Sequence, residues 1–410
     1  MSDSHKPRAL DGVRVLDLSR VLAGPWASQL LGDLGAEVIK IERPGAGDDT
    51  RGWGPPFLRD EAGASTDAAY FLSANRNKKS VAIDISAPEG ADLVRRIART
   101  SHIVLENFKV GGLKKYGLDY ASLTKVNPAL VYCSITGFGQ TGPDAPRAGY
   151  DYMIQAMGGL MSITGQPDGA PGAEPMKVGV AVADLFSGMY ASTAILAALR
   201  HAERTGEGQH VDVALFDCQI AMLANQASNY LVSGKAPGRL GNAHPNIAPY
   251  QVFQTADGHV VIAVGNDSQF AAFAKAIGAP ALAEDERYRT NRARVAARED
   301  LIAAIAPLMG KKETCAWLSI MEAAGVPAGP INSIDQVFSE PQAKARGMTV
   351  PIARADAKGL SMVPHPVKYS ATPAVADLPP PILGAHTDSV LAAFADAEEL
   401  ARLKARGIVG

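Results

Sequence analysis

The feature that most constrains the fold is a regular alternation of short apolar strands with helical segments along the N-terminal half of the chain. A β-branched, alternating segment at 13–18 is followed by helical spacing at 26–34 and by a second strand-like segment at 36–42. Further strands are expected at 80–85, 103–106, 130–134 and 210–215, with an amphipathic helix at 89–98. This pattern predicts an α/β domain with a mostly parallel sheet that is covered by helices on both faces.

The composition is that of a globular protein with more than one domain. The chain has 410 residues, of which 47% are hydrophobic and 20% charged, so a sizeable core is expected. A formal net charge of −2 argues against nucleic acid as a partner. The three cysteines, Cys133, Cys218 and Cys315, lack the spacing of a disulfide framework or a zinc site, and no metal is expected.

The first residues, MSDSHKPRALDG, lack the apolar core of a signal peptide and the Arg-rich amphipathic character of a transit peptide. No uncharged run reaches the roughly 18 to 20 apolar residues of a membrane span. We therefore expect a cytoplasmic protein with no membrane partner.

Ligands of a parallel sheet usually bind beyond the carboxyl ends of its strands. Three loops of this sequence follow strands in that way: residues 19–24, Asn107 with Phe108, and residues 136–143. The first loop has no GxGxxG pattern, so a dinucleotide site is weakly supported. The basic residues at 76–79 (RNKK) fit either a solvated turn or a phosphate contact.

The composition changes after the helix expected at 217–230. Residues 233–249 are rich in Gly, Pro and Asn. A hairpin pattern at 250–253 and 259–264 is followed by helical patterns at 268–277, 298–309 and 314–323. We expect a large domain at 1–225, a smaller α+β domain at 226–328, and a C-terminal segment at 329–410 that returns to the large domain.

Asp184 is the carboxylate with the most unusual sequence context. Residues 178–183 contain only Gly, Ala and Val, and residues 185–199 are apolar nearly all round, which predicts a buried helix that ends near Gly206. Asp184 fits two roles: the N-cap of that helix, or a poorly hydrated nucleophile for an activated acyl group. There is no HExxH or GxSxG pattern, and among the histidines we keep only His244 as a candidate site residue.

With these residues in place, the chain resembles the class III CoA-transferases, the family of formyl-CoA:oxalate and carnitine CoA-transferases. The resemblance extends over nearly the whole length. The stretches that carry it are LDGVRVLDLSRVLAGPWASQLLGDLGAEVIKIERPGAGDDTRGW, NRNKKSVAIDI, ENF and VADLFSGMYASTAILAALRHAERTGEGQHVDVALFD. It implies a Rossmann-like large domain, a small domain, and a homodimer whose two subunits are threaded through each other like linked rings.

The resemblance also implies a mechanism and its residues. An aspartate in the context of Asp184 attacks the acyl-CoA thioester, and the reaction proceeds through a mixed anhydride and an aspartyl-CoA thioester without a metal. Tyr150 and Asp151 match an aromatic and an acidic residue beside that aspartate. The implied contacts to coenzyme A are Val21, Ala23, Arg43, Asn107, Phe108 and Lys115.

Substrate choice and two alternatives stay open. Leu22 replaces a glutamine of the oxalate-specific members, and residues 241–249 replace their glycine-rich loop, whereas AGDDTRGWGPPF and GNAHPNIAPYQVF resemble the succinate-hydroxymethylglutarate (glutarate) CoA-transferases. A dicarboxylate needs a cation for its distal end, and Arg20, Arg147 and Arg239 are the candidates. One alternative is an α-methylacyl-CoA racemase, although Tyr150 stands where that class has its histidine base. The other alternative is a non-catalytic CoA-binding protein.

Overall fold

The computed structural model describes residues 7–410, apart from the side chain of Lys358. Contacts divide the chain into two compact units. The first comprises the chain up to Gly159, Gly179–Leu223 and Pro341–Gly410, and the second comprises Leu160–Val178 and Ala224–Glu340. This division places residues 160–178 with the second unit, whereas the sequence-based boundaries place them in the first.

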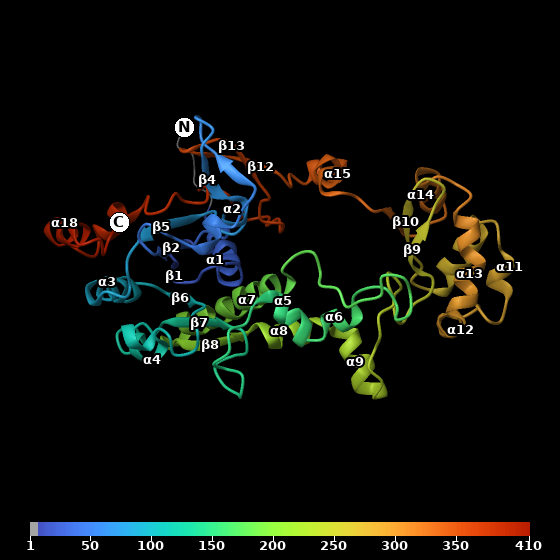
Figure 1. The fold of residues 1–410 in the computed structure, drawn as a ribbon, viewed down its shortest axis with the longest axis horizontal. Coiled ribbons are helices and arrows are strands. Elements are labelled where there is room, and N and C mark those ends of the chain that lie inside the picture. Colours follow the sequence, from blue (N-terminus) through green and yellow to red (C-terminus); the bar gives the residue numbers. More distant parts are fainter. Residues whose placement is uncertain (1–6) are drawn as a thin grey trace. The chain divides into compact units, whose positions relative to one another are not determined.

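The first unit is built on a six-stranded sheet in which every pair of neighbours is parallel (Figure 1). The strand order is β5-β2-β1-β6-β7-β8. The bounds are β1 (Arg14–Asp17), β2 (Glu37–Glu42), β5 (Lys78–Ala82), β6 (Ile103–Glu106), β7 (Val131–Thr136) and β8 (Gln209–Ala214). The chain runs outward from β1 in one direction and then from β6 in the other, so the order reverses between these two strands. In open parallel sheets this switch point is where ligands bind.

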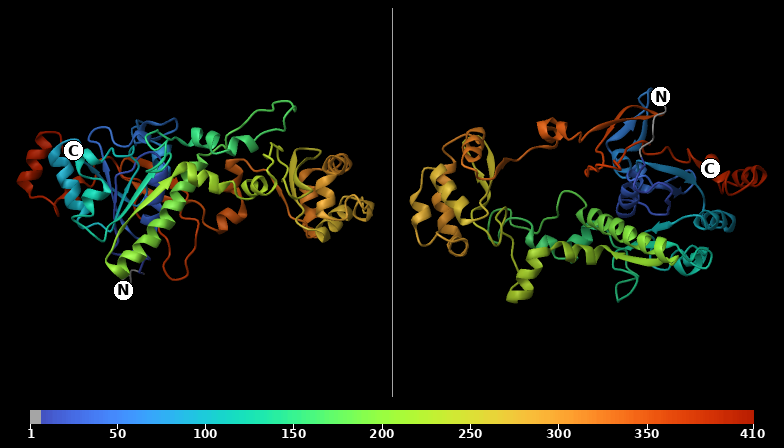
Figure 2. Two further views of the ribbon diagram at one scale, coloured as in Figure 1. Left: turned by 90° about the horizontal axis from the view of Figure 1, so that it is seen from below. Right: turned by 180° about the vertical axis from the view of Figure 1, so that it is seen from behind.

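Both faces of the sheet are buried. The neighbouring residues Val15 and Leu16 are each fully buried, yet they belong to two different hydrophobic cores, because successive side chains of a strand point to opposite faces. The first core includes α1 (Ala23–Asp33) and α7 (Val182–Thr205), and the second includes α3 (Pro88–Ala98) and α18 (Ala397–Ala405). Figure 2 shows these helices on the two sides of the sheet.

The remaining elements of the first unit lie in its connections and in the C-terminal segment. They are η1 (Asp49–Gly52), β3 (Phe57–Arg59), β4 (Ser65–Ala68), α2 (Ala69–Ser73), η2 (Lys114–Tyr116), α4 (Tyr120–Leu123), α5 (Asp151–Met157), α8 (Leu215–Met222), α16 (Pro341–Ala345), β12 (Val350–Arg354), β13 (Ala357–Met362) and α17 (Thr387–Leu391). The C-terminus covers the outer edge of β5, where Gly410 N donates to Ala82 O and Asp84 N donates to Ile408 O. An otherwise open sheet edge is thereby protected.

The second unit has an antiparallel sheet in the order β11-β10-β9 and its own core. Its elements are α6 (Leu160–Ile163), α9 (Ala224–Ser233), β9 (Tyr250–Gln254), β10 (His259–Ala263), α10 (Asp267–Ala276), α11 (Ala281–Glu284), α12 (Asn291–Ala296), α13 (Arg298–Met309), α14 (Thr314–Ala323), β11 (Ala328–Pro330) and α15 (Ile334–Ser339). Trp317 is fully buried in this core and donates from Nε1 to Met309 O. The expected fold class, an α/β large domain with a parallel sheet plus a smaller α+β domain, is confirmed.

The helix expected at 217–230 is not continuous. Helix α8 ends at Met222 and α9 begins at Ala224, whose φ of 45° lies in the left-handed region. A left-handed residue interrupts the helical hydrogen bonds, and no Gly or Pro marks the break in the sequence.

Helix α7 is, within the described residues, the one helix long and apolar enough by length and composition to cross a membrane. Helices in the cores of soluble proteins can have the same length and composition. Its residues Ala183, Ala191 and Ile195 are fully buried in the first core. The helix includes Asp184 and Arg200, so the expectation that no uncharged apolar run reaches the length of a span is not contradicted, and the helix lies in a protein core.

Candidate active site

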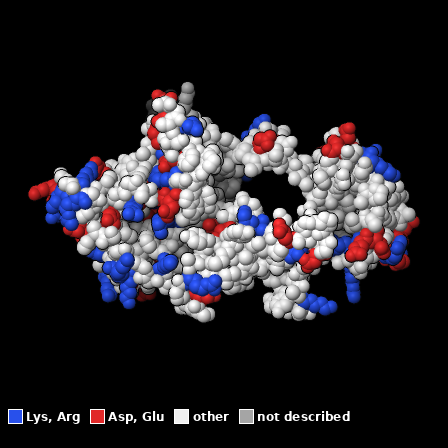
Figure 3. Space-filling model, in the orientation of Figure 1, with Lys and Arg blue, Asp and Glu red and all other residues white. Residues whose placement is uncertain are grey.

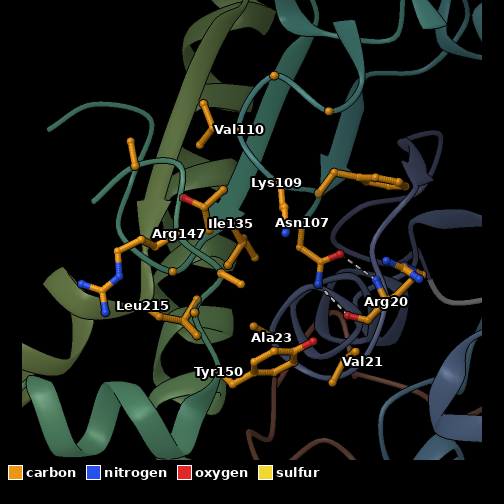
Figure 4. A pocket seen from close by; sticks show the side chains of 18 of the residues that line it. Arg20, Val21, Ala23, Asn107, Lys109, Val110, Ile135, Arg147, Tyr150 and Leu215 are labelled. Carbon is orange, nitrogen blue, oxygen red and sulfur yellow. Dashed lines mark hydrogen bonds between the residues drawn. The ribbon is translucent and has the colours of Figure 1, made fainter. Parts of the chain in front are cut away.

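A pocket of about 660 Å³ lies at the carboxyl ends of β1, β6 and β7, beside the switch point of the sheet (Figure 4). All of its lining residues belong to the first unit. They come from residues 20–23, 107–112, 115–116, 135–137, 145 and 147–150, together with Asp184 and Leu215. The pocket thus joins the turn after β1, the loops after β6 and β7, and the start of α7.

Asp184 is the carboxylate of α7 that lines this pocket. It is not the helix cap: the N-cap position is Ala181, because the helix already begins within the Gly, Ala and Val run. Burial, followed by the negative charge of Asp151, raises the pKa of Asp184 to about 7. A carboxylate that is poorly solvated in this way is a stronger nucleophile than one in water.

Asp151 is the first residue of α5 and holds the start of α7 in place. Its Oδ1 accepts a hydrogen bond of 2.8 Å from Ala183 N, and its Oδ2 accepts one of 2.8 Å from Gln155 Nε2. A helix N-terminus has unpaired amides, and here one of them is satisfied by a side chain from another helix. The predicted neighbours Asp151 and Asp184 are therefore brought together.

Tyr150 lines the pocket next to Asp151 and is 66% exposed. In Figure 4 its hydroxyl end points toward Val21 and Ala23 across the pocket. The side chain does not cap α5, although Tyr150 occupies the N-cap position. It is available to contact a bound substrate.

Asn107, which follows β6, fixes the turn after β1. Its Oδ1 accepts from Arg20 N at 2.8 Å, and its Nδ2 donates to Arg20 O at 2.6 Å (Figure 4). Both polar ends of one side chain thus hold the backbone of a single residue, through the two peptide groups that flank its Cα. The predicted site residues Val21, Ala23, Asn107 and Phe108 all line the pocket.

The amides on either side of Arg20 are occupied as well. Ser19 N donates to Asp17 Oδ1 at 2.9 Å, and Val21 N lies 3.3 Å from both carboxylate oxygens of Asp48. Three successive amides of the turn therefore have protein partners. In a dinucleotide-binding fold the equivalent turn leaves amides free for a diphosphate, whereas these three amides are not available to one.

A second pocket, of about 290 Å³, lies on the other side of Phe108. Arg43 lines it together with Glu42, Gly47 and residues 83–86. Arg20 and Phe108 line both pockets, and the guanidinium of Arg20 lies 5.5 Å from the centre of the Phe108 ring. These two side chains form a ridge between the pockets.

Lys115 lies in η2, at the rim of the first pocket, and is exposed. Its ammonium lies 4.7 Å from the centre of the Tyr116 ring. On the face shown in Figure 3, Lys and Arg side chains gather over the region of α4, which directly follows η2 in the chain. This part of the surface suits an anionic group.

The three candidate arginines do not lie together. Arg147 lines the first pocket, ion-pairs with Asp144 at 2.9 Å and lies over Phe138. Figure 4 shows the side chains of Arg147 and Arg20 extending in opposite directions. Arg239 belongs to the second unit, where it forms an ion pair with Asp168.

His244 also belongs to the second unit and does not line the pocket. Its Nδ1 accepts from Asn246 N at 3.1 Å, and its ring packs at a tilt against Tyr250. Burial and the nearby Arg298 lower the pKa of His244. These contacts shape the loop that contains it.

The basic cluster at 76–79 is structural. Arg76 is buried and ion-pairs with Asp33, and Lys78 is fully buried, with Nζ donating to Pro25 O and Asn75 Oδ1 at 2.9 Å. Burial lowers the pKa of Lys78 to about 7. Both sequence interpretations of this cluster, a solvated turn and a phosphate contact, are wrong for Arg76 and Lys78.

Sequence reasoning missed Tyr70, which lies in α2. Burial, followed by the charges of Asp184, Asp151 and Asp48, raises the pKa of Tyr70 to about 12. Its hydroxyl therefore stays protonated close to the acidic groups of the site. Trp53 meets its ring edge-on at a centroid distance of 5.3 Å. No pattern in the sequence connects residues 53 and 70 with residue 184.

Across the described residues, no group of three or more His, Cys, Asp and Glu side chains is arranged to hold a metal ion. The polar side chains that line the pocket are one carboxylate (Asp184), one amide (Asn107), two phenols, one hydroxyl and basic side chains. The chemistry they offer is acyl transfer through a carboxylate nucleophile.

Comparison with known proteins agrees with this chemistry. The model of "CoA-transferase family III" matches residues 10–387. The succinate–glutarate CoA-transferase of Agrobacterium fabrum is 54% identical over 97% of this chain and 98% of its own, and the succinyl-CoA:glutarate CoA-transferase of Mus musculus is 46% identical over 95% and 86%. The crystal structure of a CaiB/BaiF family protein from Brucella suis superposes with a TM-score of 0.83 at 50% identity, covering 95% of this chain and all of that one. The chain therefore belongs to CoA-transferase family III and is an enzyme that uses CoA thioesters as substrates.

Proposed function

We propose that this enzyme transfers CoA from succinyl-CoA to glutarate or a closely related dicarboxylate, with Asp184 as the nucleophile. The observation that carries the proposal is the Asp184 carboxylate itself, which lines the pocket at the switch point of the sheet and has its pKa raised by burial and by Asp151. The names of the two glutarate-specific relatives support the choice of substrates. The racemase alternative is not favoured, because those relatives are transferases and a tyrosine stands at position 150.

The proposed reaction exchanges acyl bonds of similar energy. An oxygen of Asp184 attacks the thioester carbon and the C–S bond breaks. CoA leaves as a thiolate, and the acyl group stays on Asp184 as a mixed anhydride. The thiolate then attacks the carbonyl carbon of Asp184, which releases the first acid as a carboxylate and leaves an aspartyl-CoA thioester. The acceptor carboxylate attacks that thioester, the C–S bond breaks, and a second mixed anhydride forms with release of CoA thiolate. The thiolate then attacks the acyl carbon of the acceptor, which gives the new acyl-CoA and frees Asp184 as a carboxylate.

We place CoA across the two pockets. The pantetheine arm lies against Val21, Ala23 and Asn107 in the first pocket, and the adenine lies near Arg43 in the second. Arg20 and Phe108 line both pockets, so the molecule passes over them. Lys115 at the rim supplies a positive charge for the phosphates.

Arg147 is the cation that we propose for the distal carboxylate of the diacid. It lines the same pocket as Asp184, whereas Arg20 lies on the path of CoA. The side chain of its partner Asp144 is 41% exposed. An exposed ion pair of this kind contributes little free energy, so a substrate carboxylate can replace Asp144 at low cost. That Arg239 and His244 contact the substrate stays a prediction.

The homodimer is supported by apolar side chains that a single chain leaves exposed. On α7 these are Phe186, Met189 and Tyr190, which are between 43% and 51% exposed, and on α9 Leu231 and Val232 reach 78% and 89%. Exposed apolar patches of this kind often mark protein interfaces. Light scattering tests the proposal: a particle of 42.9 kDa, the mass of one chain, contradicts it.

We also propose a cytoplasmic location. The three cysteines are free thiols, and thiols persist in reducing compartments. Localisation of the full chain in its own cells by fractionation checks this, and recovery in the membrane or secreted fraction contradicts it.

The nucleophile is tested by incubating the enzyme with succinyl-CoA and measuring the intact mass and the modified peptide. We expect an adduct of the mass of CoA on Asp184 in the wild type and in Asp217→Ala. Asp217 is a matched control because it also lies in the first turn of a helix but outside the pocket. Asp184→Ala is expected to lose both adduct and transfer. Full transfer by Asp184→Ala refutes the mechanism, and deuterium uptake at the α-carbon without an acceptor points to the racemase.

A further inference from the structure

The backbone of Val21 has an unusual conformation for its residue type. Its φ is 72°, and among the described residues only Asn77 and Ala224 are other non-glycine residues with positive φ. A β-branched residue is strained in this region because its side chain crowds the backbone. Such strain persists only where surrounding contacts enforce it.

Asp48 supplies the contact that holds this residue. Both of its carboxylate oxygens lie 3.3 Å from Val21 N, and the side chain is anchored from the other side by Thr50, whose N and Oγ1 donate to Oδ1 at 3.0 and 2.8 Å. Asp48 is 1% exposed and also lines the second pocket, so the effect of Asp48 through Val21 has to be separated from a direct effect on that pocket.

Lys40 provides the counter-charge and a second hold on the same turn. Its fully buried ammonium donates to Asp48 Oδ2 at 2.9 Å and to Ser19 O at 2.8 Å. Burial alone would raise the pKa of Asp48, but the charge of Lys40 and the hydrogen bonds from Thr50 lower it to about 2. Asp48 is therefore ionised at neutral pH and accepts from Val21 N with its full charge.

Val21 is a wall of the pocket that contains Asp184, so its conformation sets the shape of that wall. Asn107 holds the backbone of the neighbouring Arg20, and among the residues that the structure describes only Asp48 accepts from the amide of Val21. We infer that Asp48 is a positioning residue for CoA: it keeps Val21 in the left-handed conformation that shapes the thioester pocket. This inference rests on the proposed function, because it assigns the pocket to CoA.

The chain offers a matched control for a merely structural effect. Asp33 is also a fully buried carboxylate in an ion pair, with Arg76, and it accepts from the side-chain Nδ2 of Asn77, a residue of positive φ. Neither pocket that we assign to CoA includes Asp33, Arg76 or Asn77. Loss of either carboxylate is expected to cost folding stability, but only the loss of Asp48 is expected to change CoA binding.

The experiment measures CoA binding by isothermal titration for Asp48→Asn and Asp33→Asn, each with Val21 and with Val21→Gly. We expect Asp48→Asn to weaken CoA binding by about tenfold, the scale of a strained residue that relaxes, and Asp33→Asn to change it less than about twofold. Glycine adopts positive φ without strain, so in the Val21→Gly background the effect of Asp48→Asn is expected to fall below about threefold. Steady-state kinetics should show the same change in KM for succinyl-CoA, with KM for the acceptor unchanged.

Several outcomes overturn the inference. If Asp48→Asn binds CoA as the wild type does, or if its effect is equally large with glycine at position 21, Asp48 does not act through Val21. If Asp48→Asn does not fold, Thr50→Val loosens Asp48 while keeping its charge pair, and it is expected to weaken CoA binding about threefold; unchanged binding then overturns the inference. If the wild type itself does not bind CoA, the proposed function fails, and this result is distinct from a failure of Asp48 alone.

Discussion

Asp151 accepts a hydrogen bond of 2.8 Å from the amide of Ala183, the residue directly before Asp184, and the same carboxylate raises the pKa of Asp184 by its charge. One side chain therefore both fixes the start of α7 and disfavours the ionised form of its neighbour. The two roles can be separated, because asparagine keeps an oxygen acceptor and loses the charge.

Asp151→Asn is expected to shift the acid limb of the pH profile. Transfer requires ionised Asp184, so kcat/KM of the wild type should rise with pH through about 7, the pKa of Asp184. Without the charge of Asp151 the limb should move to lower pH, whereas Asp151→Ala, which also loses the acceptor, should lower kcat/KM at all pH values. Initial rates with succinyl-CoA between about pH 5 and 9 measure this. An unshifted limb in Asp151→Asn shows that Asp151 does not tune the nucleophile.

Asp184→Asn is expected to stabilise the folded protein at neutral and higher pH. The pKa of Asp184 is raised in the folded state, so ionising it opposes folding; this cost is absent below the unfolded pKa of about 3.9 and grows until the pH passes about 7. The gain in the free energy of unfolding at pH 8 should be about 2 kcal/mol, allowing for partial screening of the carboxylate by solvent. Urea unfolding at pH 8 and at pH 4 checks it. Equal gains at the two pH values contradict the electrostatic origin.

The parts of the fold that depend on local patterns were predictable. The bounds expected for residues 103–106, 298–309 and 314–323 are those of β6, α13 and α14, because the apolar residues of these segments follow a clear local pattern. The parallel sheet followed from the alternation of strands and helices. Asp184 could be singled out because small apolar residues precede it.

The parts that depend on contacts between distant residues were not predictable. In the sequence Lys78 fits a solvated turn or a phosphate contact. Only the folded sheet, in which β2 lies between β5 and β1, brings Asp17 Oδ2 within 3.3 Å of its ammonium. The hydrogen bond from Val21 N to Asp48 likewise joins two loops, one after β1 and one after β2. Of the two roles open to Asp184, the helix cap is wrong for a local reason, since the helix begins at Val182, two residues before Asp184.

The break between α8 and α9 also lacked a sequence signal, and it leads to a prediction. Ala224 is exposed with φ of 45°, so Ala224→Gly should relieve left-handed strain and stabilise the protein by about 0.5 to 1 kcal/mol. Ala221 is an exposed residue within α8, and Ala221→Gly should instead cost about 1 kcal/mol. Urea unfolding of both variants measures the difference. If both glycines destabilise equally, the left-handed conformation at 224 is not a source of strain.

Arg147 gives the last prediction, on substrate choice. If its guanidinium binds the distal carboxylate, Arg147→Ala should lower kcat/KM for glutarate by about a hundredfold, the scale of a lost charged hydrogen bond, while kcat/KM for pentanoate, which has the same chain length and no distal carboxylate, stays within about threefold. Arg147→Lys should recover part of the preference, because an ammonium keeps the charge without the bidentate geometry.

Arg200→Ala is the matched control, since Arg200 is a surface residue 71% exposed and lies outside the pocket. The ratio of kcat/KM values for glutarate and pentanoate, measured with one fixed donor, separates substrate choice from general activity. If this ratio is unchanged in Arg147→Ala, a different cation binds the distal carboxylate, and Arg239 is then the next residue to replace.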